Sequence, residues 1–242
     1  MKIKKLAIFA LTVSVSFNSG ALGVDSLIKL MDDTQDTFTV SNNDGYRQFV
    51  NLMISDVKII DGELSQMPYD KDNIADWTLE VRPNKLILDN GQSKKILVRY
   101  IGEVQRKQDK LYSISIMPTP YYAENEVPNN TVQMVIGVAP YVIMPASIDA
   151  PLQYSVKYSK EYIEVTNFGG TYFNANVKAC DSVELKVPVE ECISTSYVLS
   201  GREVKIPLPE RTNKGNVEVS FRTNNNTYKE TFELTPGQLK KQ

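Results

Sequence analysis

Few side chains in this 242-residue chain could do chemistry, and histidine is absent. A Ser–His or Cys–His nucleophile is therefore impossible, and the commonest general base is missing. Adjacent carboxylates such as Asp32–Asp33 and Glu190–Glu191 lie in polar runs, where charged side chains are normally solvated. The chain also lacks a glycine-rich phosphate-binding loop. These observations predict a protein that is not an enzyme and that uses no cofactor.

Cys180 and Cys192 are the only cysteines. In an exported chain, two cysteines twelve positions apart most simply form a disulfide, worth on the order of 3 kcal/mol in the chain-entropy model. A zinc site is not expected, because zinc takes about four ligands and neither a CxxC spacing nor a histidine is present. We predict a disulfide in the C-terminal half and no metal.

The first 23 residues have the layout of a secretory signal peptide. Lys2, Lys4 and Lys5 precede an apolar run from Leu6 to Phe17, and small and polar residues follow as far as Gly23. Cleavage after Ala21 or after Gly23 would each leave a small residue at the cut, and an uncleaved membrane anchor is the alternative. Since no later stretch approaches the roughly 18 apolar residues of a membrane span, we expect a soluble, exported mature protein.

The charge balance does not suggest a nucleic-acid partner. The chain has 27 basic and 29 acidic residues, and removal of the three lysines of the signal leaves 24 basic residues. A mature chain with an excess of acidic residues offers no basic patch for a phosphate backbone. We therefore expect no nucleic-acid binding.

The most informative stretch is Thr131 to Pro145, TVQMVIGVAPYVIMP. Val132, Met134, Ile136 and Val138 share one parity, and Val135, Ala139 and Tyr141 share the other, so a strand here is apolar on both faces. Pro140 has no backbone N–H, which favours an edge strand or a bulge over a central strand. An apolar edge strand needs a cover. The cover is either another protein or, if the strand is internal, the rest of the domain.

The remaining pattern is that of an all-β protein in two domains. Short runs rich in Val, Ile and Tyr alternate with turn residues along the chain, and the third run, Gln48 to Ile60, is the longest. The residue pattern changes after Pro145, where a short linker follows. We therefore assign residues 24–145 to an N-terminal domain and residues 146–242 to a C-terminal β-sandwich. The polar tail from Thr235 to Gln242 is expected to be frayed.

The order of these parts resembles the periplasmic pilus-assembly chaperones of the chaperone–usher pathway (PapD-like). The residues that carry the resemblance are Arg82 to Ser93 (RPNKLILDNGQS), the alternating strand that ends in Arg99, and the Val132-Met134-Ile136 alternation. The branch that serves colonisation-factor fimbriae is the most similar, and its members also have a cysteine pair in the second domain. The resemblance implies two immunoglobulin-like domains arranged as a boomerang.

The resemblance also implies a function. Chaperones of this family bind fimbrial (pilin) subunits in the periplasm, complete each subunit with a donor strand and deliver it to an outer-membrane usher. Carried over to this sequence, the donor residues are Val132, Met134 and Ile136, with Val138 as a fourth, while Val135 and Ala139 face the core. Self-association of the free protein would be another way to cover the strand. The alternative function is an exported structural or adhesive β-sandwich protein, such as a fimbrial subunit.

In one respect the sequence departs from the best-known members of that family. Those members hold the subunit's C-terminal carboxylate with one basic residue on the first strand and one on the donor strand. Here the first strand offers only Lys29, and the donor strand has neither lysine nor arginine. Either Lys29 acts with a basic residue of a neighbouring strand, such as Arg99, or backbone N–H groups hold the carboxylate. Lys29 could also be an ordinary solvated lysine.

Overall fold

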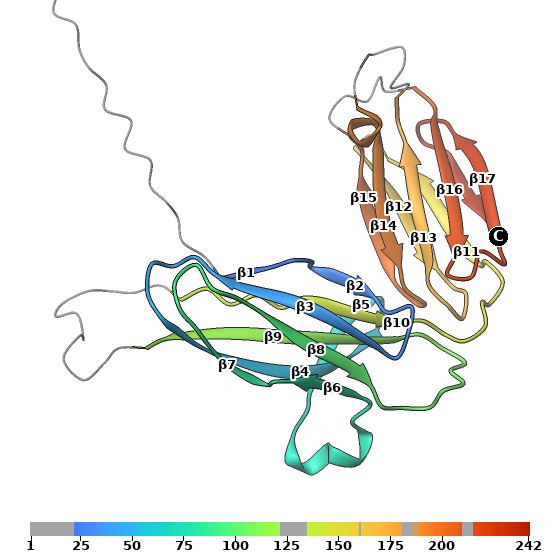
Figure 1. The fold of residues 1–242 in the computed structure, drawn as a ribbon. Coiled ribbons are helices and arrows are strands. Elements are labelled where there is room, and N and C mark those ends of the chain that lie inside the picture. The colour runs from blue at the N-terminus through green and yellow to red at the C-terminus, as the bar shows by residue number, and fades with distance from the viewer. Residues whose placement is uncertain (1–21, 122–134, 160, 181–185, 187, 210–214) are drawn as a thin grey trace, which may run out of the picture.

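The computed structural model describes residues 22–121, 135–159, 161–180, 186, 188–209 and 215–242, and it confirms the all-β fold. The described chain forms two β-sandwiches, each built from two sheets with its own apolar core. Figure 1 shows the first sandwich lying across the view and the second standing at one end of it, as in a boomerang.

The first sheet of the N-terminal sandwich has four antiparallel strands, and in its two central strands apolar residues recur at every second position. In β3 and β8, Phe38, Val40, Ile96 and Val98 are fully buried, while the residues between them are partly exposed. In spatial order, the strands are β1 (Leu22–Val24), β3 (Gln35–Asn42), β8 (Ser93–Tyr100) and β6 (Leu79–Arg82).

The second sheet of this sandwich is built around the long strand β4. The predicted run from Gln48 to Ile60 has the same bounds as β4, and its even positions Val50, Leu52 and Ile54 face the core. In spatial order the strands are β2 (Ile28–Leu30), β10 (Tyr141–Met144), β9 (Lys110–Pro120), β4 (Gln48–Ile60) and β5 (Glu63–Pro68), while β7 (Lys85–Leu88) pairs with the first part of β4. Between β5 and β6 the chain makes a short 3₁₀ helix, η1 (Lys71–Asp76).

The C-terminal sandwich packs its sheets around a core of aromatic and β-branched side chains, with Tyr154, Phe173 and Phe221 at its centre. One sheet contains β15 (Glu203–Pro207), β12 (Tyr162–Asn167), β11 (Tyr154–Tyr158) and β18 (Leu239–Lys241). The other contains β14 (Ile193–Val198), β13 (Phe173–Lys178), β16 (Val217–Thr223) and β17 (Lys229–Leu234).

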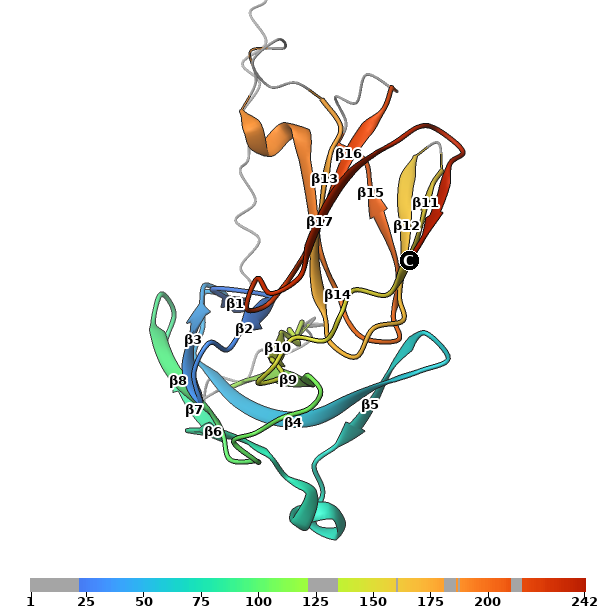
Figure 2. The ribbon, with the colours of Figure 1, turned by 90° about the vertical axis from the view of Figure 1, so that its right-hand side faces the viewer.

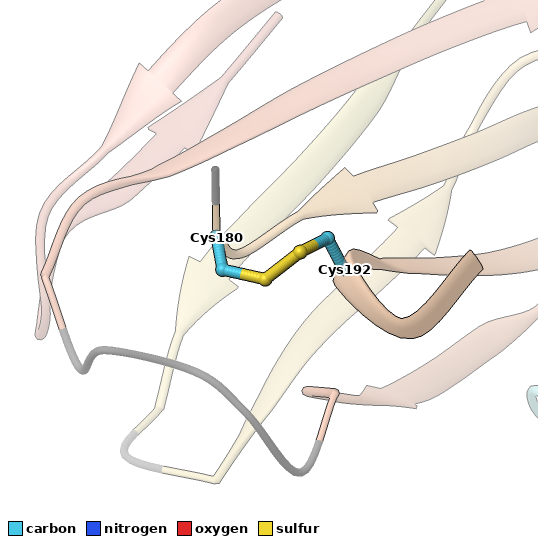
Figure 3. The surroundings of a disulfide bond; sticks show 2 residues. All are labelled: Cys180 and Cys192. Carbon is cyan, nitrogen blue, oxygen red and sulfur yellow. A yellow bond between two sulfur atoms is a disulfide. The ribbon is translucent and has the colours of Figure 1, made fainter. Parts of the chain in front are cut away.

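The predicted disulfide is confirmed. Cys180 follows β13 and Cys192 ends the 3₁₀ helix η2 (Val189–Cys192), and the bond joins these two segments beneath the end of the sandwich (Figure 3). Cys192 is fully buried and Cys180 nearly so. The bond therefore closes the twelve-residue loop that the spacing predicted.

Of the two cleavage sites considered, the one after Ala21 leaves β1 intact. Leu22 and Gly23 belong to β1, and Leu22 pairs with Asn42 and is only 4% exposed. The expectation of a frayed tail was wrong. The polar tail is not frayed, because Leu239–Lys241 pairs with β11, and Lys240 Nζ contacts Glu230 and lies 3.8 Å from the centroid of the Phe232 ring. Most of the expected signal peptide, residues 1–21, lies outside the described residues.

The two sandwiches meet in a small apolar cluster. Val57, Leu111 and Ile143 project from the outer face of the second sheet and pack against Tyr172 of the C-terminal domain. The β4–β5 hairpin adds a polar contact, because Arg202 Nη1 donates to the Gly62 carbonyl at 2.6 Å and pairs with Glu63 at 2.8 Å. Figure 2 shows this hairpin reaching beneath the end of the second sandwich.

A buried carboxylate joins the domains as well. Asp109, which precedes β9, accepts hydrogen bonds from the N–H of Ala146 in the linker and from the N–H of Tyr172 in the C-terminal domain. Burial raises the pKa of Asp109, against the effect of these two hydrogen bonds, and the charge of Asp149 adds to the rise. One carboxylate thus holds together three segments that are distant in sequence.

Candidate functional site

The open edge of the second sheet lies where β10 begins. β2 covers β10 only from Tyr141 to Ile143, so residues 135–139 have β9 on one side and no strand on the other among the described residues. Val138 and Ile116 exchange backbone hydrogen bonds of 3.1 and 2.8 Å, and Ile114 N–H donates to the Pro140 carbonyl at 2.9 Å. The N–H and C=O groups of residues 137 and 139 therefore point away from β9, toward the open edge.

The side chains on this edge do not follow the expected pattern. Ile136 is 63% exposed, as expected for a side chain that points outward. Val138, which was also expected to point outward, packs against the domain's own core. The expected core residues Val135 and Ala139 are exposed. Val132 and Met134 lie outside the described residues, so their role as donor residues stays a prediction.

Pairing with β9 explains the difference. Val142 lies opposite Tyr112, and Val138 forms a bridge with Ile116; both β9 residues are fully buried in the core. Because residues directly opposite in a sheet share a face, Val138 and Val142 turn toward the core. The expectation that Val138 faces outward and that Val135 and Ala139 face inward was therefore wrong.

An apolar patch adjoins the open edge. Phe49, Ile87 and Met117 are each between 37% and 45% exposed on the outer face of the second sheet. Ile87 pairs with Phe49, and the Met117 side chain lies so close to Gly137 that a Cβ there would be 2.4 Å from its sulfur. A Cβ on Gly137 would also lie 2.9 Å from the backbone oxygen of Ile116, so glycine allows the edge segment to approach β9 and Met117 this closely, and the edge and the patch form one surface. Exposed apolar patches of this kind mark interaction sites.

Lys29 is not free to bind a partner's carboxylate. Its Nζ donates to the Thr37 carbonyl at 2.6 Å and lies 3.6 Å from Asp36, 3.9 Å from Asp25 and 4.8 Å from the centroid of the Phe38 ring. The side chain is only 17% exposed. It therefore points into the first sandwich, where it balances two carboxylates of its own domain.

Arg99 does not join Lys29. It lies on β8 in the other sheet, between the buried residues Val98 and Tyr100, so its side chain projects from the outer face. There it pairs with Glu80 at 2.8 Å. The expectation of a joint Lys29–Arg99 anchor is not supported, because the two side chains are on opposite sides of a sheet.

A different basic residue lies at the junction of the domains. A pocket of about 300 Å³ is lined by Leu30 of the first domain and by polar residues of the second, among them Asn174, Tyr197, Arg222 and Asn226. Arg222 projects from β16 and is exposed, and the amides and the phenol beside it can also donate hydrogen bonds. Sequence reasoning missed Arg222, because only the packing of the two domains brings β16 beside β2.

The chemistry available on these surfaces is that of binding. No group of three or more metal-ligating side chains is found among the described residues. Within the same residues no helix has the length and apolarity needed to cross a membrane. What the structure offers is an open strand edge, an apolar patch and a pocket of hydrogen-bond donors.

Comparison with known proteins agrees with the sequence resemblance. Residues 24–145, half of the chain, match the family described as CS5 fimbrial protein N-terminal domain. The chain belongs to this family. The matched region is the whole N-terminal sandwich with its open edge.

One relative and two solved structures illustrate the similarity. The relative is an Escherichia coli protein described as the "uncharacterized 25.9 kDa protein in CS5 3'region"; it is 24% identical over 132 residues, which cover 54% of this chain and 57% of that protein. The class 5 fimbriae chaperone CfaA has the same fold, with 11% identity, a TM-score of 0.50 and coverage of 90% of this chain and 99% of that one. The SafB chaperone, solved with the Salmonella enterica SafA pilin, has 19% identity, a TM-score of 0.49 and coverage of 92% and 98%.

Proposed function

We propose that this protein is a periplasmic chaperone that binds fimbrial subunits by strand addition and delivers them to an outer-membrane usher. The observation that carries the proposal is the open edge at residues 135–139, in a domain that belongs to a fimbrial family. The fold shared with the chaperone CfaA supports it. In this role the protein is not an enzyme and needs no cofactor.

The edge can bind a strand without reading its sequence. Outward N–H and C=O groups at residues 137 and 139 supply ladder hydrogen bonds to an added strand. Ile136 supplies an apolar side chain that is still 63% exposed and lies next to the core residue Val138. A subunit that packs on Ile136 would extend the core of the first sandwich into its own, so that both proteins bury apolar surface. Without a subunit, self-association would cover the same edge.

The alternative, a fimbrial subunit, is less well supported. A subunit that awaits a donor strand has an incomplete core, whereas here β10 closes the first core with Val142 and Met144, both essentially buried. The chain then continues into a second complete sandwich.

For the subunit's terminal carboxylate we assign the pocket at the domain junction. Arg222 supplies the positive charge that neither Lys29 nor Arg99 offers there, and Leu30 places the pocket beside β2 and therefore close to β10. A guanidinium can bind a carboxylate in bidentate geometry.

The test compares two aspartate substitutions on one strand. Ile136→Asp should leave the periplasmic yield of the protein nearly unchanged and abolish co-purification of the fimbrial subunit, because a charge would enter an apolar contact. Val138→Asp should lower the yield of the protein itself, because that side chain packs on the core. Ile148→Asp, at an isoleucine that is 79% exposed in the linker, is the matched control and should change neither quantity.

Two results would refute strand addition at this edge. One is Ile136→Asp protein that captures the subunit as well as the wild type does. The other is an equal loss of yield for Ile136→Asp and Val138→Asp, which would mean that both side chains serve only the fold.

A further inference from the structure

A gap in the second sheet exposes the backbone of β4. β7 pairs with β4 from Gln48 to Asn51, and β5 pairs with it from Ser55 to Ile60, so residues 52–54 have no strand on that side. Leu52 N–H donates to the Asn84 carbonyl, and the Ile54 carbonyl accepts from Tyr69 N–H, both at 2.9 Å. The Leu52 carbonyl and the Ile54 N–H point the same way and have no hydrogen-bond partner among the described residues.

This gap is the floor of an apolar groove. The groove has a volume of about 810 Å³ and lies between the two sheets of the first sandwich, from Met53 on β4 to Val81 on β6. Met53 and Ile101 line it and are 49% and 48% exposed, while Leu79 and Val81 connect it to the buried core. A groove of this size and composition is typical of ligand sites.

Two stacked aromatic rings form one wall. The rings of Tyr69 and Trp77 lie 5.0 Å apart and within 10° of parallel. The Tyr69 hydroxyl accepts from the N–H groups of Thr78 and Leu79 at 3.0 and 3.1 Å, and Trp77 Nε1 donates to Asn73 Oδ1 at 2.7 Å. Because their polar atoms are satisfied, the rings are held in place and present apolar surface to the groove.

We propose that this groove binds an extended peptide segment of a partner protein, with a bulky apolar side chain between the rings and the sheet. The unpaired acceptor and donor on β4 are two residues apart on one side of a strand, which suits the backbone of an added peptide and not a purely hydrocarbon ligand. The apolar walls suit the side chain.

Charge at the rim suggests what flanks that side chain. Glu80 pairs with both Arg82 and Arg99, so two guanidinium groups share one carboxylate. Arg82 lines the groove, and its side chain is 70% exposed. Among the residues that line the groove, Arg82 is the cation, and because most of its side chain is exposed it can also pair with an acidic residue beside the apolar one.

The site is independent of the proposed subunit edge. The groove opens on the β4–β6 side of the sandwich, whereas the subunit edge is at β10, with β9 between β10 and β4. Figure 1 shows the neighbouring η1 segment, coloured teal, projecting from the first sandwich on the side away from the second. Both sites could therefore be occupied at once.

The test uses the mature wild-type protein and the peptide acetyl-Glu-Leu-Phe-Leu-Glu-amide, with acetyl-Glu-Ser-Ser-Ser-Glu-amide as the control peptide. Trp77 is the only tryptophan of the chain, so its fluorescence reports on this groove alone. We expect the apolar peptide to shift Trp77 emission to the blue in a saturable manner. In amide exchange measured by NMR, the Ile54 N–H should exchange freely before the peptide is added and be protected after it.

Three substitutions locate the binding. Met53→Glu and Ile101→Asp alter half-exposed groove residues and should each weaken peptide binding at least tenfold, while capture of the fimbrial subunit stays at the wild-type level. Ile74→Glu changes an isoleucine that is 58% exposed on η1 and does not line the groove, so it should have no effect.

Several outcomes would overturn the proposal. One is that neither the Trp77 fluorescence nor the Ile54 amide signal responds to millimolar apolar peptide. Another is that the changes in the amide signals are confined to residues 135–139. A Trp77 shift that follows protein concentration without peptide would assign the groove to a second copy of the chain instead. Unchanged affinity in both Met53→Glu and Ile101→Asp would likewise place the peptide elsewhere.

Discussion

Replacing Asp109 by alanine should loosen the joint between the two sandwiches. Its carboxylate accepts hydrogen bonds from the N–H groups of Ala146 and Tyr172, and these two residues are only 5% and 2% exposed. Asp109→Ala leaves both N–H groups buried without a partner, and each such group costs about 1–3 kcal/mol. Part of that loss is offset, because a carboxylate that burial disfavours is removed. We expect a net loss on the order of 2–4 kcal/mol, most of it from the interface.

Calorimetry and solution scattering measure this loss. The wild type should unfold with its domains coupled, whereas Asp109→Ala should separate the transitions and broaden the scattering-derived distance distribution. Asp109→Asn should fall between them, because the two N–H groups bond different carboxylate oxygens and asparagine keeps only one oxygen. Asp76→Ala, at an exposed carboxylate of η1, is the control. Unchanged unfolding and scattering in Asp109→Ala would refute the role of this carboxylate in the joint.

The pH dependence has a defined sign. Since burial raises the pKa of Asp109 above the usual 3.8, the folded protein binds a proton at this site more readily than the unfolded chain does. Its contribution to stability is therefore fully present below the ordinary aspartate value and is lost as the pH rises through the raised one. The stability of the wild type relative to Asp109→Asn should accordingly fall with rising pH across that window. A difference that grows with pH would contradict the assignment.

Three further predictions concern other parts of the chain. Cys180→Ala together with Cys192→Ala should cost about 3 kcal/mol and lower the melting temperature of the C-terminal domain by on the order of 10 °C, and equal melting curves for wild type and variant would contradict this. Arg222→Glu should reduce capture of the fimbrial subunit. Two control variants should not reduce it: Lys229→Glu, at the cross-strand neighbour of Arg222 outside the pocket, and Lys29→Met. Equal effects of the two glutamate variants would exclude a specific anchor at Arg222. Intact mass of the periplasmic protein should place its first residue at Leu22, because cleavage after Gly23 would remove a buried leucine worth about 1.5–3 kcal/mol; a start at Val24 would show that β1 is dispensable.

The sequence alone determined those features that depend on local alternation and spacing. The bounds of β4 could be predicted because in a half-buried strand the alternation of apolar and polar residues marks the two faces. The Cys180–Cys192 bond could be predicted because an exported chain with two cysteines most simply pairs them with each other. β5 was missed because its sequence, ELSQMP, has no alternating apolar residues and forms a strand only by pairing with β4. The tail strand β18 was missed for the same reason, since its pairing with β11 is not encoded locally.

Tertiary structure decided which side chains of a strand face the core and which are available for binding. A sequence that is apolar at both parities, such as Thr131 to Pro145, does not say which parity faces the core; the pairing of Val142 with Tyr112 does. The sequence suggested Lys29 as an anchor for a subunit's carboxylate, but the fold places Asp36 and the carbonyl of Thr37, both on β3, beside its ammonium group. Arg222 lies where the two domains meet, and the groove at Leu52–Ile54 lies where β5 and β7 leave part of β4 unpaired. Long-range pairing and domain packing create such sites, and these contacts join residues that leave no common pattern in the sequence.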